Sequence, residues 1–177
     1  MGSPKQLLVV CGLPGTGKTT VATMLSEQLE APLIRTDVVR KDLFTDPEYT
    51  SEETAVTYEE TLTRSGSAIE RDGIAIVDGT FRTSALRETA RQRASTSGAT
   101  FDLVYVTCSQ DVVEERIAKR TDDESDADFE IYKHLRSIFE SPPESCYQVD
   151  NSGSLEETRH QLRVVCEDVT SQAVSSN

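Results

Sequence analysis

A glycine-rich stretch near the N-terminus has the residue types and the spacing that bind a chain of phosphates. It reads Gly12-Leu13-Pro14-Gly15-Thr16-Gly17-Lys18-Thr19, and it fits the pattern G-x-x-x-x-G-K-[ST] at every fixed position. Glycines let the backbone curl so that successive N–H groups point at one anion. Lys18 adds a positive charge for the β- and γ-phosphates, and the Thr19 hydroxyl is a ligand for Mg²⁺. We therefore expect this loop and Thr20, which follows it, to bind ATP together with Mg²⁺.

Two aspartates stand where apolar runs end, and each has a chemical role beside a phosphate chain. Asp78 closes the run Ile74–Val77, where a carboxylate would anchor Mg²⁺ together with Thr19. Asp-Gly is also a turn dipeptide, so Asp78 fits a plain turn as well. Asp37 follows the run Pro32–Arg35, where it could accept the proton of a hydroxyl that attacks the γ-phosphate. Aspartate also favours the N-cap of a helix, which is the alternative for Asp37.

Four arginines could complete a phosphotransfer site. Arg40 lies three residues after Asp37, on the same face of a helix start, and could hold the substrate or the transferring phosphoryl group. Arg82 follows Asp78 by four residues and could also reach the substrate. Arg116 and Arg120 are four apart on one predicted helix face, from which they would fold over the nucleotide phosphates and stabilise charge in the transition state. Each of these arginines also fits a solvated surface with acidic neighbours.

The elements that must position these residues alternate along the chain. Apolar runs predict five strands, at about 6–11, 32–35, 73–78, 101–107 and 146–150. Amphipathic stretches predict helices at 18–30, 37–44, 51–72, 83–97, 110–120, 127–140 and 154–170. This alternation predicts an α/β, three-layer P-loop NTPase fold: a five-stranded parallel sheet with helices on both faces and a small helical lid. The candidate residues follow strand ends, where open parallel sheets bind ligands.

One domain is expected over residues 4–171, with a polar tail at 172–177. The polar stretch at about 116–130 suits the lid. The loop Asp150–Gly153 follows the last strand, and its position suggests that it covers the adenine. Helical spacing predicts core packing for four apolar residues, namely Phe129, Tyr132, Leu135 and Phe139.

Composition limits the partners and the compartment. The 177 residues carry a formal net charge of −13, which disfavours binding to duplex nucleic acid. Apolar runs stay far below the ~20 residues that span a bilayer, and no signal-peptide pattern precedes the first strand, so we expect a cytoplasmic protein without a membrane partner. The four cysteines form no C-x-x-C pair and predict buried thiols in a reducing compartment rather than a zinc site.

In combination, these motifs resemble the small P-loop kinases. The residues that carry the resemblance are Gly12 to Thr19, Asp37-x-x-Arg40, Asp78-Gly79-Thr80-Phe81 and Glu115-Arg116-x-x-x-Arg120. The chain is similar to the branch with phage polynucleotide 5′-hydroxyl kinase, zeta toxins and chloramphenicol phosphotransferase, and to the ATP-binding half of proteins fused to aminoglycoside-phosphotransferase-like domains. The resemblance implies that Lys18 and Thr19 serve ATP and Mg²⁺. It also implies a general base at Asp37, a substrate-holding partner at Arg40 and two lid arginines.

Two functions of different classes fit this site. The first is an ATP-dependent kinase that moves the γ-phosphoryl group to a hydroxyl of a small molecule, a nucleotide or a polynucleotide 5′ end. The net charge disfavours the nucleic-acid acceptor. The second is a nucleotide-binding ATPase or switch with water as the only acceptor, and the sequence has no N-K-x-D motif that would indicate a GTPase. The two functions differ in where the phosphoryl group goes.

The acidic excess, with 13 arginines and only 5 lysines, predicts adaptation to high salt. Removing salt should therefore lower the thermal unfolding temperature, because unscreened carboxylates repel one another in the folded chain. Circular dichroism melts in concentrated KCl and in buffer without added salt measure the difference. Sucrose is the control, since it favours burial without screening charge. Equal folding and activity without salt would contradict this prediction.

Overall fold

The sheet is built around its first strand. The structure, a computed structural model, describes residues 4–120 and 125–175. Within them, five strands form one sheet in the order β2-β3-β1-β4-β5, and all neighbouring pairs are parallel. The strands are β1 (Lys5–Cys11), β2 (Leu33–Arg35), β3 (Ile74–Asp78), β4 (Ala99–Thr107) and β5 (Tyr147–Asp150). Parallel pairing brings all five carboxyl ends to one edge of the sheet.

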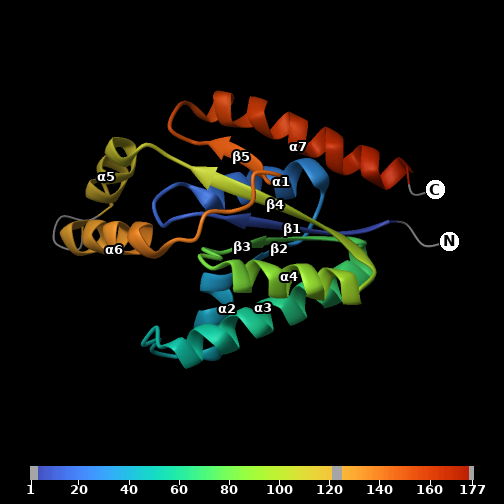
Figure 1. Cartoon of the computed structure of the whole chain (residues 1–177), viewed down its shortest axis with the longest axis horizontal. Helices are drawn as coiled ribbons and strands as arrows, with labels where there is room; N and C mark the ends of the chain where they lie inside the picture. The colour runs from blue at the N-terminus through green and yellow to red at the C-terminus, as the bar shows by residue number, and fades with distance from the viewer. Residues whose placement is uncertain (1–3, 121–124, 176–177) are drawn as a thin grey trace.

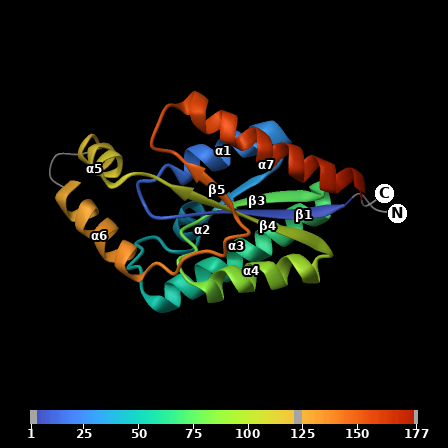
Figure 2. The same cartoon turned by 45° about the horizontal axis from the view of Figure 1, so that its top comes forward.

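Helices cover both faces of this sheet (Figure 1). On one face lie α1 (Lys18–Leu29) and α7 (Leu155–Ser175), and on the other α3 (Ser51–Asp72) and α4 (Ser84–Thr96). The short helix α2 (Thr36–Leu43) packs against α3. Beyond the carboxyl ends of the strands lie α5 (Gln110–Ala118) and α6 (Ser125–Ile138), in both views (Figure 1, Figure 2). This arrangement is the three-layer α/β fold of P-loop NTPases, which confirms the predicted fold class.

The central strand explains why the chain is so apolar near its start. Leu8 and Val10 face α1 and α7, while Leu7 and Val9 face α3 and α4. A strand covered on both faces reads as a continuous apolar run rather than as an alternating one. Its burial also specifies how it pairs with its neighbours, and the pairing sets Val10 opposite Asp78 of β3. The core thereby brings the end of β3 beside the start of the glycine loop.

A third, smaller core joins α5 and α6 to the glycine loop. Tyr132 of α6 is buried together with Val113 and Ile117 of α5 and with Leu13 of the loop. The other three residues predicted to pack there also contact this cluster: Phe129, Leu135 and Phe139. The core prediction for all four is therefore confirmed. Residues 121–124 of the expected lid lie outside the described residues.

Helix α5 is shorter than the sequence predicts. It ends at Ala118, so Arg120 lies in the turn beyond it and does not extend the helix face that carries Arg116. The Arg120 N–H bonds the carbonyl of Ile117, three residues back, as in the tight turns that end helices. The expectation that the two arginines share one helix face is therefore wrong.

Helix α7 is longer than the sequence predicts. It continues to Ser175, so most of the expected polar tail is helical. Val165 and Val169 are buried in the core and hold the helix against the sheet close to its end. Although α3 and α7 are long, no helix of residues 4–120 and 125–175 is long and apolar enough to cross a membrane.

Leu25 of α1 is fully buried in the core between α1, α7 and the sheet. Leu25→Ala should lower the free energy of unfolding by about 2–5 kcal/mol, because the lost contacts leave a cavity that relaxes only partly. Urea unfolding followed by circular dichroism measures the change. Val164→Ala is the matched control, since this side chain is exposed on α7 and its loss should change the free energy by less than about 0.5 kcal/mol. Equal losses in both variants would contradict the assigned core.

Candidate functional site

The glycine loop between β1 and α1 has a backbone that only glycine adopts easily. Gly15 and Gly17 have φ angles of 79° and 86°, in the left-handed region that costs other residues about 1–2 kcal/mol. Gly17 is the N-cap of α1, so the turn leads directly into the first N–H groups of that helix. The Thr16 hydroxyl donates to the Leu13 carbonyl at 2.7 Å and closes the turn. Main-chain N–H groups and a helix N-terminus are thereby directed at one place, as the binding of a phosphate requires.

Two oxygen ligands that suit a magnesium ion meet at the carboxyl end of β3. The Thr19 hydroxyl donates a hydrogen bond of 2.7 Å to Oδ2 of Asp78, a residue that is buried. Magnesium prefers hard oxygen ligands of this kind, so the pair fits the ion predicted from the sequence. Arg35 lies beside them, with its Nε 3.5 Å from the same carboxylate oxygen. That Nε is buried, and Nη2 of the same guanidinium donates to the Thr19 hydroxyl at 3.4 Å, so Arg35 contacts both predicted ligands of the ion.

Lys18 and two carboxylates form the electrostatic centre of the site. Burial lowers the pKa of the Lys18 ammonium, and the charges of Asp78 and Asp37 oppose this effect. Both predicted aspartates therefore lie within electrostatic reach of the loop lysine. Asp78 is buried, whereas Asp37 is exposed in the first turn of α2, so the two carboxylates are suited to different roles. The charge of Arg120 also lowers the pKa of Lys18, so this arginine acts electrostatically on the loop lysine despite the early end of α5.

The loop after β5 closes over the glycine loop. Asn151 is buried and donates from Nδ2 to the Thr16 carbonyl at 2.9 Å. Arg116 donates to the same carbonyl at 3.4 Å and to the Asn151 carbonyl at 2.7 Å. A Cβ added to Gly17 would stand 2.2 Å from Nδ2 of Asn151. Arg116 thus contacts the glycine loop, while its predicted role over the nucleotide phosphates and the role of the Asp150–Gly153 loop in covering adenine stay predictions.

Arg40 is more enclosed than a residue that simply holds a substrate would be. Its guanidinium contacts α3, with Nη2 donating to the Thr54 hydroxyl at 3.2 Å and Nη1 lying 3.6 Å from Glu53 Oε2. The ring of Tyr49 covers it, at 4.7 Å between the ring centroid and Cζ. Arg40 is buried and Asp37 is exposed, so the two do not share one environment despite their spacing. Nη1 is buried and faces the Glu53 carboxylate without a hydrogen bond, so this nitrogen is directed at α3.

Tyr58 of α3 connects Arg82 with the other residues of the site. Burial raises the pKa of its phenol to about 12, and the charges of Arg40, Asp37 and Arg82 also act on it. The three residues predicted to contact the substrate therefore all act electrostatically on one hydroxyl group. That hydroxyl accepts a hydrogen bond of 3.0 Å from the Phe81 N–H, which holds the loop that carries Arg82.

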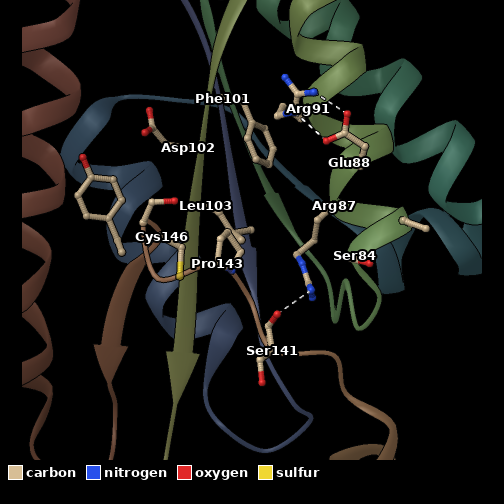
Figure 3. A pocket seen from close by; sticks show the side chains of 13 residues that line it. Ser84, Arg87, Glu88, Arg91, Phe101, Asp102, Leu103, Ser141, Pro143 and Cys146 are labelled. Atoms are coloured by element: carbon tan, nitrogen blue, oxygen red, sulfur yellow. Dashed lines mark hydrogen bonds and ion pairs between the residues drawn. The ribbon is translucent and has the colours of Figure 1, made fainter.

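One cavity lies beside these groups, and a second lies apart from them. One of about 360 Å³ adjoins the glycine loop, with Leu13 and Thr16 on one side and Tyr132 of α6 on the other. A second, of about 810 Å³, lies between α4, β4 and the segment before β5, and Leu103 and Arg87 are among its lining residues (Figure 3). Its walls contain no residue of the glycine loop. The smaller cavity therefore belongs to the nucleotide end of the site, and the larger one is separate.

Sequence reasoning assigned no role to three residues of the site. Arg35 is the last residue of β2, and its role follows from the pairing of β2 with β3, which sets it opposite Asp78. Asn151 lies in a loop that the sequence analysis did single out, although its contact with Thr16 could not be inferred. Tyr58 gave no signal, because nothing in the spacing of a long amphipathic helix marks one tyrosine as facing the site. Strand order and helix packing, rather than spacing along the chain, bring these residues into the site.

Comparison with known proteins agrees with this architecture. The profile of a family described as AAA domain matches residues 7–142. The match runs from β1 to the segment after α6 and covers more than half of the chain. The chain therefore belongs to this family of AAA domains.

Relatives in mycobacteria share most of this chain. Uncharacterized protein Rv2004c of Mycobacterium tuberculosis is 27% identical over 163 residues, a match that covers 85% of this chain and 32% of that protein. Uncharacterized protein Mb2027c of Mycobacterium bovis matches to the same extent. The chain thus spans about a third of the length of the curated relatives it matches.

Solved structures of kinases share the fold. The APS kinase CysC of M. tuberculosis, in complex with AMPPNP and APS, is 19% identical with a TM-score of 0.73, over 94% of this chain and 99% of that one. A gluconokinase from Sinorhizobium meliloti is 20% identical with a TM-score of 0.68, over 97% and 99%. At these identities the likeness concerns the fold.

Gly17→Ala should weaken ATP binding at least about tenfold, because the new methyl group would meet Asn151 and displace the loop that binds phosphate. Isothermal titration with ATP and Mg²⁺ measures the affinity. Gly73→Ala is the matched control: its φ of 80° is just as unfavourable for alanine, but a Cβ there meets nothing within 4 Å. This control should lose about 1–2 kcal/mol of stability and keep its ATP affinity. Equal ATP affinities in the two variants would contradict the assigned contact.

Proposed function

We propose that this chain is an ATP-dependent kinase that transfers the γ-phosphoryl group to a hydroxyl group. The observation that carries the proposal is that Asp37, an exposed carboxylate, lies within electrostatic reach of Lys18 in addition to the buried Asp78. A hydrolase also needs a group that orients the attacking water, so the feature that favours an acceptor larger than water is the exposure of Asp37 in the first turn of α2. A second, exposed carboxylate adds a group that can accept the proton of an attacking hydroxyl.

The nucleotide end of the proposed site consists of the glycine loop and the residues around it. Lys18 and the main-chain N–H groups bind the β- and γ-phosphates. Thr19 and Asp78 would hold Mg²⁺, which would supply neutralising charge to the phosphates. Arg116 and Arg120 add positive charge where negative charge develops in the transition state. The hydrogen bond from Arg116 to the Thr16 carbonyl and the effect of the Arg120 charge on Lys18 support these roles.

The acceptor end of the proposed site lies around the Tyr58 hydroxyl. Asp37 accepts the proton as the acceptor oxygen attacks, and Arg40 and Arg82 orient the acceptor through its polar or anionic groups. The charges of Arg40 and Arg82 both act on the Tyr58 phenol, which supports this role. The net charge of −13 favours a small molecule or a nucleotide over a polynucleotide 5′ end. The kinases that share this fold, named for gluconate and APS, are in line with a small acceptor.

Asp37→Asn should slow phosphotransfer about 10²–10⁴-fold, because the amide keeps the shape of the side chain and cannot accept the proton. ATP affinity should stay unchanged, since Asp37 does not hold the nucleotide. Transfer is followed with labelled ATP against a panel of sugars, sugar acids, nucleosides and 5′-hydroxyl oligonucleotides. Asp42→Asn is the control, because Asp42 lies on the same helix and pairs with Arg64 on the surface.

The outcomes separate the two candidate functions. Transfer by Asp37→Asn at the parental rate would show that Asp37 is not the base. If the parent protein releases phosphate to water with every member of the panel, the chain acts as an ATPase or nucleotide switch.

A further inference from the structure

Arg87 of α4 lies at a junction between two segments that are far apart in the sequence. The residue is 5% exposed. Its Nη1 donates to the Phe81 carbonyl at 2.8 Å, and its Nη2 donates to the carbonyls of Glu140 at 3.0 Å and Ser141 at 3.3 Å. Figure 3 shows the side chain reaching from α4 to the segment that contains Ser141. A planar guanidinium has several donors in a fixed arrangement, so one side chain can hold carbonyls from both segments.

Further bonds tie the same two segments together. The Glu140 N–H donates to the Arg82 carbonyl at 2.9 Å. The Glu140 carboxylate accepts a hydrogen bond of 2.7 Å from the Ser84 N–H. Phe139, which precedes Glu140, packs under the Arg87 guanidinium, with 5.8 Å between Cζ of Arg87 and the ring centroid. The loop after β3 and the end of α6 are therefore joined on both sides of Arg82.

The loop that Arg87 holds is strained. Phe81 is fully buried and has a φ of 44°, in the left-handed region that a bulky residue adopts only when its surroundings impose it. Its N–H is held by the Tyr58 hydroxyl and its carbonyl by Arg87. Arg82 follows directly. The direction in which its side chain leaves the loop thus depends on the conformation that these two contacts impose on Phe81.

We propose that Arg87 is a positioning residue of the phosphotransfer site: it clamps the strained loop after β3 to the end of α6 and thereby directs Arg82 at the acceptor. The inference rests on the proposed function of the site. Because α6 also packs on Leu13 of the glycine loop through Tyr132, the clamp holds the acceptor end in register with the nucleotide end. Lysine could not replace Arg87 in this role, since its ammonium is a point charge that cannot span the same carbonyls.

Hydrogen exchange followed by NMR tests the clamp without any ligand. Arg87→Met keeps an apolar stem of similar length and removes the guanidinium. The amides of Phe81 and Glu140 should then exchange at least about tenfold faster, because both lose the neighbour that holds their segments together. Amides at the centre of β1 should not change relative to the global stability measured in the same sample. Arg91→Met is the matched control, because Arg91 lies on the same helix and pairs with Glu88 at the surface.

Kinetics test the positioning role. With the acceptor found in the panel described above, Arg87→Met should raise the acceptor KM about tenfold or more and leave the KM for ATP within about twofold. If Arg87 had a merely structural role, its replacement would lower stability without raising the acceptor KM relative to the ATP KM. Arg87→Lys keeps the charge and serves if Arg87→Met does not fold. It should show the same split and faster exchange at the same two amides.

The possible results are distinguishable. Unchanged exchange at Phe81 and Glu140 in both Arg87 variants would overturn the clamp. Faster exchange with an unchanged acceptor KM would overturn the positioning role and leave the proposed kinase activity intact. If the parent protein phosphorylates no acceptor, the proposed function fails, and the positioning role fails with it, while the exchange data decide the clamp by themselves.

Discussion

The hydrogen bond between the Thr19 hydroxyl and the Asp78 carboxylate joins the first turn of α1 to the end of β3, and the arrangement of the site depends on it. The burial of β1 on both faces sets Val10 opposite Asp78, and the Thr19 hydroxyl lies 2.7 Å from that carboxylate. The same carboxylate lies 3.5 Å from Arg35 of β2. One buried oxygen therefore connects three elements at the edge where the parallel strands end, and the glycine loop faces this edge.

Most of the positive charge near the site of this acidic chain comes from arginine side chains. Arg35, Arg40, Arg87 and Arg116 are buried or half-buried, and each contacts carboxylates, hydroxyls or main-chain carbonyls near the site. A guanidinium is weakly hydrated and has donors in a fixed plane, so it can be enclosed at a lower cost than an ammonium and can hold several oxygens at once. This explains how a chain with a formal net charge of −13 gathers positive charge at one place.

Much of the fold could be predicted because the signals are local. The apolar run ending at Asp78 and the helix beginning at Lys18 are read from neighbouring residues, and both elements have nearly the predicted bounds. Predictions that depended on the exact residue at which a helix ends were less accurate. Arg120 was assigned to the face of Arg116, but α5 ends two residues before it, because the last turn tightens and nothing in the side-chain pattern marks that point.

The sequence by itself determined the phosphate-binding loop, since its glycines, lysine and threonine are adjacent and act through backbone conformation and a helix terminus. It also determined the alternation of strands and helices. Only the tertiary structure decided what surrounds that loop. Arg35 contacts Asp78 because β2 pairs with β3. Asn151 contacts Thr16 because β5 pairs with β4, which in turn pairs with β1. The enclosure of Arg40 likewise depends on how α2 packs on α3. Contacts of this kind depend on strand order and helix packing, which spacing along one chain does not encode.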